Sequence, residues 1–273
     1  MDNYLRKYII YKNKYIKLKK KNKIKLLNDI NLSNDMKNKI NNLLLDEKLK
    51  FIEANIKEIN LYQKYINEEF FTQNELVQMR TCTIFAKNGC LEILKSARKL
   101  NPPCYWDDKT CEEAAANGHL EILKWCRSQN PPCPLNKFVC NRAAANGHVK
   151  ILQWCKSQNE SYPLDKWICV NAAENGHLEI LKWCRSLIPP CPWDTDTCSS
   201  ATKNGHLEIL QWCRTQNPPC PWDEYTCFLA AGNGFLNILQ WCRNQDTPCP
   251  WNKTIILSYP FISNEIRDWI INN

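Results

Sequence analysis

The chain has 273 residues, a formal net charge of +8 and seventeen cysteines. Its positive charge is concentrated in residues 1–50, which hold fourteen Lys or Arg against five Asp or Glu. No apolar run reaches the roughly 18 residues that a membrane span needs, and no signal peptide is recognisable. We therefore expect a soluble, intracellular protein without a membrane span.

The first part of the chain is a basic segment, residues 1–33, that we expect to be helical. Its apolar seam alternates spacings of four and three residues: Tyr4, Tyr8, Tyr11, Tyr15 and Leu18. Such spacing is typical of a short coiled coil and favours self-association. The lysines of residues 1–27 leave nucleic-acid binding as an alternative use. Residues 34–71 have helical apolar spacing and are predicted to be a helical connector or N-terminal cap.

A 29-residue repeat organises the chain after this point. The dipeptide Asn-Gly recurs six times without insertion, at Asn88, Asn117, Asn146, Asn175, Asn204 and Asn233. Sixteen of the seventeen cysteines fall nine, sixteen or twenty-three residues after one of these positions or after the corresponding position one period earlier. A fixed period of this size is the signature of a solenoid.

Each unit is predicted to contain two helices. The first begins at a Trp-Asp pair, mostly within the motif PWD, where Asp107, Asp194 and Asp223 are suitable N-caps and the preceding Trp has the spacing of a hydrophobic staple. It contains small Ala pairs that allow a neighbouring helix to approach closely. Asn-Gly ends it, because these residues tolerate a left-handed backbone.

The second helix of each unit is amphipathic. In residues 119–129 the apolar side chains form one stripe, which leaves Glu121, Lys124 and Arg127 toward solvent. The connector Pro-Pro-Cys-Pro that follows cannot continue a helix. The sequence therefore predicts an all-α array of helix pairs.

The string AAANGHLEILKWC resembles the core of the ankyrin repeat. The matching positions are Ala114, Ala115, Gly118, His119, Leu120, Ile122, Leu123 and Cys126. The resemblance covers residues 72–260 and implies an ankyrin-like α-solenoid, with a C-terminal capping helix over residues 261–273. The unit is shorter than the usual ankyrin repeat, and PPCPW stands where the family has a β-hairpin finger. The PPCPWD and WC motifs also resemble ankyrin proteins of mimivirus-like giant DNA viruses.

The cysteines raise the question of a metal or redox site. His119 and Cys126 lie about 10 Å apart along one helix at about 1.5 Å per residue, too far to share one zinc ion as neighbours. Cysteines of one slot in adjacent units are expected about 8–10 Å apart, beyond the reach of a disulfide. Pairing across different slots stays open. We favour cysteine as a small buried apolar residue and predict no metal and no cofactor, with a metal-binding or redox-sensitive protein as the alternative.

The remaining polar motifs do not indicate catalysis. The four histidines each follow the repeated Gly, and Phe235 takes that slot in another unit, which favours packing. No phosphate-binding loop or hydrolase motif is present. We therefore predict no catalytic residues and no enzyme activity.

Positions that differ between units form one face of the first helix. They lie 20, 21, 24, 25 and 28 residues after the repeated Asn. The residues predicted to bind a partner protein are Lys109, Glu112, Phe138, Asn141, Arg142, Trp167, Val170, Asn171, Asp196, Tyr225 and Phe228. The aromatic members are suitable anchors. The expected function is a non-catalytic scaffold for a host or viral protein, in the host cytoplasm if the source is viral; neutral drift of a surface is the alternative.

Overall fold

The structure is a computed structural model that describes residues 81–99, 103–158 and 164–273. These residues belong to one compact unit, Gln63–Asn273, and they form fourteen helices and no strand. The predicted all-α fold is confirmed. The predictions made for residues 1–71, including the coiled coil, fall outside the described residues.

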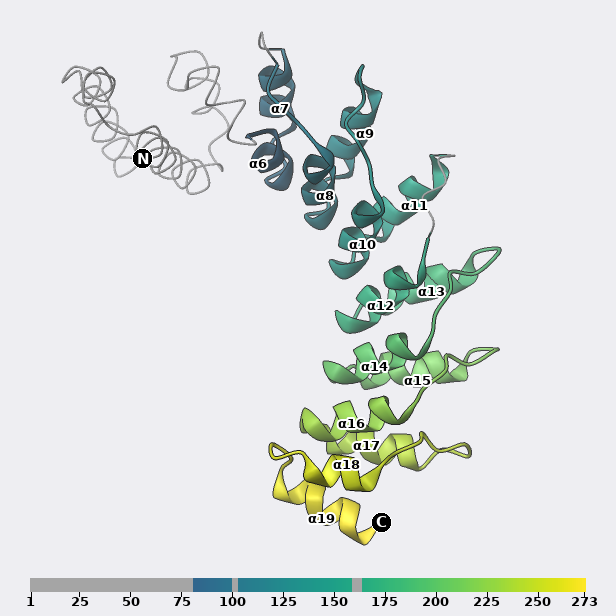
Figure 1. Cartoon of the computed structure of the whole chain (residues 1–273). Coiled ribbons are helices and arrows are strands. Elements are labelled where there is room, and N and C mark those ends of the chain that lie inside the picture. Colours follow the sequence, from purple (N-terminus) through teal and green to yellow (C-terminus); the bar gives the residue numbers. More distant parts are fainter. Residues whose placement is uncertain (1–80, 100–102, 159–163) are drawn as a thin grey trace, which may run out of the picture. The chain divides into compact units, whose positions relative to one another are not determined.

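The helices follow one another in pairs (Figure 1). The first helices are α6 (Thr81–Lys87), α8 (Asp108–Ala116), α10 (Lys137–Ala145), α12 (Lys166–Glu174), α14 (Thr195–Lys203), α16 (Glu224–Gly232) and α18 (Lys253–Ser258). The second helices are α7 (Leu91–Arg98), α9 (Leu120–Ser128), α11 (Val149–Ser157), α13 (Leu178–Ser186), α15 (Leu207–Thr215), α17 (Leu236–Arg243) and α19 (Asn264–Asn272).

Successive first helices pack directly against one another from α6 to α16, whereas each second helix packs mainly on its own first helix. The contact is close because the first helices meet through small side chains, such as the fully buried Ala143 and Ala144. Ile and Leu of the second helices, for example Ile151 and Leu152, complete the core of each unit. The array is therefore two layers of helices, with the first helices forming one continuous layer (Figure 1).

The first helices begin at capping residues, as predicted. Asp107, Asp194 and Asp223 occupy N-cap positions, and the Asp194 carboxylate accepts a hydrogen bond from the backbone N–H of Asp196 at 3.1 Å. Asn136 caps α10 in the same way, by accepting from the N–H of Phe138 at 3.0 Å. Asp194 and Asn136 thereby each satisfy a backbone donor that the first turn leaves without a partner in the helix.

Asn-Gly ends these helices through two separate roles. The six repeated glycines have φ between 75° and 82°, a left-handed backbone that other residues rarely adopt. The preceding Asn turns its side chain back onto the helix, as where Asn146 Nδ2 donates to the Arg142 carbonyl at 2.9 Å. The dipeptide therefore reverses the chain and satisfies one of the last carbonyls of the helix.

Each histidine joins its own unit to the preceding one. The His148 ring lies over Gly118, and its Nε2 donates to the carbonyl of Ala116, 3.2 Å away. Because a carbonyl can only accept, Nε2 carries the proton in this arrangement. His119, His177 and His206 repeat the contact one unit apart, and the Phe235 ring covers Gly205 where Phe takes the place of His. The packing interpretation of these histidines is confirmed.

The arginine that recurs in the second helices is partly buried, so the prediction that Arg127 faces solvent is wrong. Arg127 is half-buried, and its Nη1 donates to the Cys133 carbonyl at 3.1 Å. In other units the guanidinium also lies over a Trp ring, as for Arg185 over Trp193 at 4.1 Å. Trp193 in turn meets Trp212 of the next second helix edge-on, with ring centroids 6.2 Å apart. Where a Trp precedes the cap, it thus links successive units.

We expect Gly118→Ala to destabilise the array more than Gly234→Ala. Both glycines have positive φ, so an added Cβ costs about 1–2 kcal/mol of backbone strain at either position. At Gly118 the Cβ would also lie 2.8 Å from the His148 ring, whereas nothing lies within 4 Å of it at Gly234. Overpacking adds about 1–3 kcal/mol. Urea unfolding followed by circular dichroism measures both losses, and equal losses would contradict the role given to the His148 contact.

Candidate functional site

The predicted partner-binding residues lie on the layer of first helices, from α8 to α16. Five are exposed: Lys109, Phe138, Arg142, Trp167 and Tyr225. Five are half-buried: Glu112, Asn141, Asn171, Asp196 and Phe228. The eleventh, Val170, is buried. The predicted face therefore exists as a surface, but its members differ in what they contact.

Val170 does not belong to a binding surface, and its inclusion was wrong. Its side chain is only 5% exposed, and Ser199, at the equivalent position of α14, is 6% exposed. The helices α12 and α14 pack closely against each other, and this position is buried in both of them. An apolar residue there contributes to the stack.

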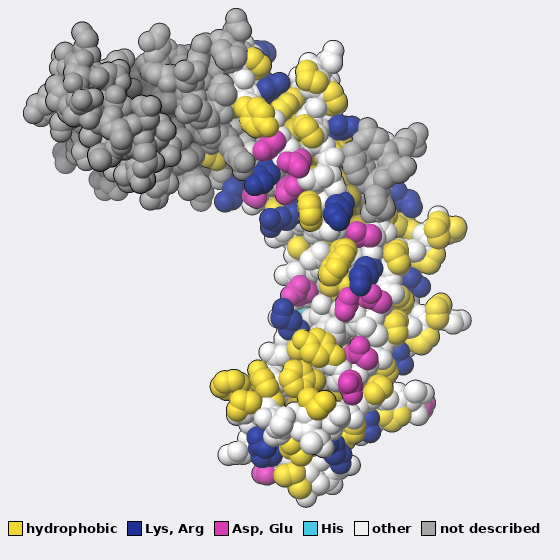
Figure 2. Space-filling model, viewed as in Figure 1, with side chains coloured by type: hydrophobic (Ala, Val, Ile, Leu, Met, Phe, Trp, Pro, Cys, Tyr) yellow, Lys and Arg dark blue, Asp and Glu magenta, His cyan; other side chains and the backbone are white. Residues whose placement is uncertain are grey.

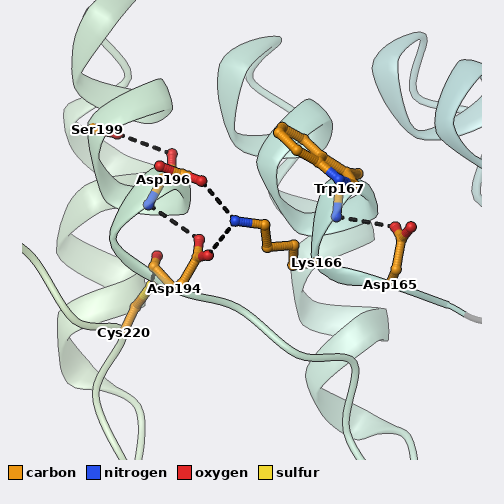
Figure 3. A network of polar contacts seen from close by, with 7 residues as sticks. All are labelled: Asp165, Lys166, Trp167, Asp194, Asp196, Ser199 and Cys220. Atoms are coloured by element: carbon orange, nitrogen blue, oxygen red, sulfur yellow. Dashed lines mark hydrogen bonds and ion pairs between the residues drawn. The ribbon is translucent and has the colours of Figure 1, made fainter.

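Two charged members of the face connect units to one another. Asp196 accepts a hydrogen bond from Lys166 at 2.8 Å, and Asp194 accepts from the same ammonium group at 2.6 Å (Figure 3). These two carboxylates raise the pKa of Lys166 above its ordinary value. Glu112 is engaged similarly, because it accepts from Asn136 Nδ2 of the next unit at 2.7 Å. The prediction that variable residues are free of stacking contacts is therefore wrong for Glu112 and Asp196.

Five predicted residues come together around a surface hollow between α10 and α12. The hollow has a volume of about 400 Å³ and is lined by Lys137, Phe138, Asn141, Arg142, Ala145, Trp167 and Asn171. Phe138 and Trp167 are 50% and 47% exposed, which is unusual for such large apolar rings. Lys137 lies 5.5 Å from the Phe138 ring centre and Lys166 lies 5.1 Å from that of Trp167. The hollow combines two aromatic walls with a cationic edge.

Tyr225 and Phe228 belong to a second aromatic group, separated from the hollow by α14. Their rings stack with centroids 5.9 Å apart, and Phe228 also meets Tyr259 at 5.3 Å. Tyr259 contacts Phe261, whose side chain is 78% exposed. Figure 2 shows hydrophobic side chains gathered at this end of the array. Sequence comparison between units missed Tyr259 and Phe261 because the last unit has no copy to compare with; the aromatics on either side of Pro260 were the available signal.

Cysteines of different slots converge inside the units, a possibility that sequence spacing left open. All seventeen cysteines lie among the described residues, and all are buried. Three groups have all three Sγ atoms within 4.8 Å of one another: Cys111, Cys126 and Cys133; Cys169, Cys184 and Cys191; Cys227, Cys242 and Cys249. His119 belongs to none of them. Burial agrees with the predicted packing role, but the groups are also the described residues best placed to hold a metal ion.

No protein-family model matches the chain, and no curated protein matches it. Among the described residues, no helix is both long enough and apolar enough to cross a membrane.

We expect Val170→Ala to lower the stability of the array more than Trp167→Ala does. Val170→Ala removes two buried methyl groups and should lower the free energy of unfolding by about 1.5–3 kcal/mol. Trp167→Ala removes a half-exposed ring and should change it by about 1 kcal/mol or less. Thermal and urea unfolding of both variants measure this difference. A larger loss of unfolding free energy for Trp167→Ala than for Val170→Ala would show that the Trp167 ring stabilises the helix packing.

Proposed function

We propose that the chain is a non-catalytic protein-binding scaffold of the ankyrin type, with the partner bound on the layer of first helices. The observation that carries the proposal is the hollow between α10 and α12, where Phe138 and Trp167 remain half-exposed on a packed layer. Large aromatic rings left in solvent are typical of binding anchors. The residues on this face differ between units, whereas the residues that pack the helices repeat. This difference also supports a role of the face in binding a partner protein.

The rigid layer explains how such a surface binds with little ordering cost. Close packing through Ala pairs and the His177 contact with the Ala145 carbonyl hold α10 and α12 in one arrangement before a partner arrives. The Lys166 ion pairs fix α12 against α14 in the same way. A preformed surface avoids most of the entropy loss that a flexible one suffers on binding. The energy gained by covering the two rings is then available for affinity.

The chemistry of the hollow favours a partner segment with apolar and acidic side chains. Phe138 and Trp167 offer apolar surface, while Lys137 and Arg142 place positive charge on the same hollow. The resemblance of the repeat to ankyrin proteins of mimivirus-like viruses extends the proposal to a viral adaptor, acting on a host or viral protein in the host cytoplasm.

The test is a comparison of bound proteins for the intact chain and a triple variant, Phe138→Ala, Trp167→Ala and Tyr225→Ala. Proximity labelling in the relevant host cells should lose most of the proteins enriched by the intact chain, because all three anchors are removed. Retained helicity by circular dichroism would show that the array still folds.

A matched control is Tyr105→Ala. The side chain of Tyr105 is 52% exposed, a fraction similar to those of the three anchors. Tyr105 lies in the connector before α8 and not on the first-helix face. We expect its partner set to equal that of the intact chain. The same partner set for the triple variant would contradict the proposed surface.

A further inference from the structure

The three cysteine triads are built alike, from three separate segments of one unit. In the first, α8 supplies Cys111, α9 supplies Cys126 and the proline connector supplies Cys133. The connector cysteine is held in place by its backbone: Cys133 N–H donates to the Cys126 carbonyl at 3.0 Å, and its own carbonyl accepts from Arg127. The same two bonds recur at Cys191 and Cys249. Each triad is therefore positioned by the fold.

The spacing of the sulfur atoms is close to that of a three-thiolate metal site. A metal ion about 2.3 Å from each of three sulfurs in a plane separates the sulfurs by about 4 Å. The Sγ atoms of each triad lie within 4.8 Å of one another. Side-chain movements of less than about 1 Å would bring them to that geometry, without moving either helix.

The ligand set selects the kind of ion. Thiolates favour soft ions such as Cu(I), while zinc adds a fourth ligand to complete a tetrahedron. Over the described part of the chain, no His, Asp or Glu joins any of the three groups. We propose that the three cysteine triads are binding sites for a soft monovalent cation, Cu(I), each held by three thiolates.

Nearby cations offset the charge that such a site acquires. Binding of one Cu(I) to three thiols releases three protons and leaves two net negative charges at the site. Arg127 Nη1 donates to the backbone carbonyl of Cys133 at 3.1 Å, which places one guanidinium beside the first triad. Arg185 donates in the same way to the Cys191 carbonyl at 3.0 Å in the second triad.

Access is provided from the connector side. Cys133 is buried, but Pro132 and Pro134 on either side of it are exposed. Movement of this short connector brings one ligand to solvent without opening the helix pair. The connector cysteine of the first triad is thus buried directly between two exposed residues of the chain.

The chain contains its own natural control, a unit with two of the three cysteines. Cys82 and Cys104 occupy the slots of Cys111 and Cys133, but Ala97 stands in place of Cys126. The backbone there is the same, since Cys104 N–H donates to the Ala97 carbonyl at 3.1 Å. Ala97→Cys should therefore complete a further triad in a framework that already exists.

The experiment is anaerobic titration of the reduced full-length chain with Cu(I) against the chelator bicinchoninate, with native mass spectrometry to count bound ions. We expect at least three Cu(I) ions for each chain and three sulfur ligands for each copper by X-ray absorption. Cys133→Ser should lose one ion, and Ala97→Cys should gain one. Cys140→Ser changes a buried cysteine that belongs to none of the three triads, so its count should equal that of the intact chain.

Several outcomes would overturn the assignment. They are no Cu(I) retained against the chelator, an unchanged count for Cys133→Ser and Ala97→Cys, or an equal loss for Cys140→Ser and Cys133→Ser. Preferential uptake of Zn(II) over Cu(I) would also overturn it. Because Ala97→Cys adds a ligand, its result stands even if Cys133→Ser fails to fold. The proposal is independent of the partner-binding surface, whose variants leave all seventeen cysteines in place.

Discussion

The close packing of successive first helices is the contact on which the rest of this structure depends. It requires small side chains in the middle of each first helix, and fully buried Ala pairs supply them in α8, α10, α12 and α16. A larger residue would push neighbouring helices apart along the whole layer. Once the helices are this close, the variable residues of adjacent first helices lie near one another. Some of these side chains are buried between the helices, some form hydrogen bonds to the next unit, and the others remain at the surface.

The junction between units keeps this packing in register. The left-handed glycine turns the chain at the end of each first helix, and the ring of the next unit lies directly over it. The ring donates to a carbonyl that the helix end leaves unsatisfied, so one side chain provides both packing and a hydrogen bond. Phe235 keeps only the first of these roles. The 29-residue period without insertions keeps each ring and the glycine it covers at the same sequence separation in every unit.

The variable positions serve the stack and the surface together. Val170 fills a seam, while Glu112 and Asp196 accept hydrogen bonds across neighbouring units. Phe138 and Trp167, one unit apart, remain half-exposed around the same hollow. Variation between units is therefore a mixture of local fitting between helices and freedom at the surface. Variation between units therefore does not by itself identify the binding residues, whereas exposure of large aromatic side chains does.

The sequence by itself determined the elements of this protein: the helix pairs, their caps, the Asn-Gly ends and the burial of the cysteines. These follow from local backbone preferences and from periodicity, which a repeated sequence displays many times over. It did not determine which cysteines meet, because Cys111, Cys126 and Cys133 come together only through the angle and distance at which α8 packs on α9. The same holds for the Arg and Trp contacts between units and for the burial of Val170. Tertiary structure decided these features, since each depends on contacts between residues that local spacing does not relate.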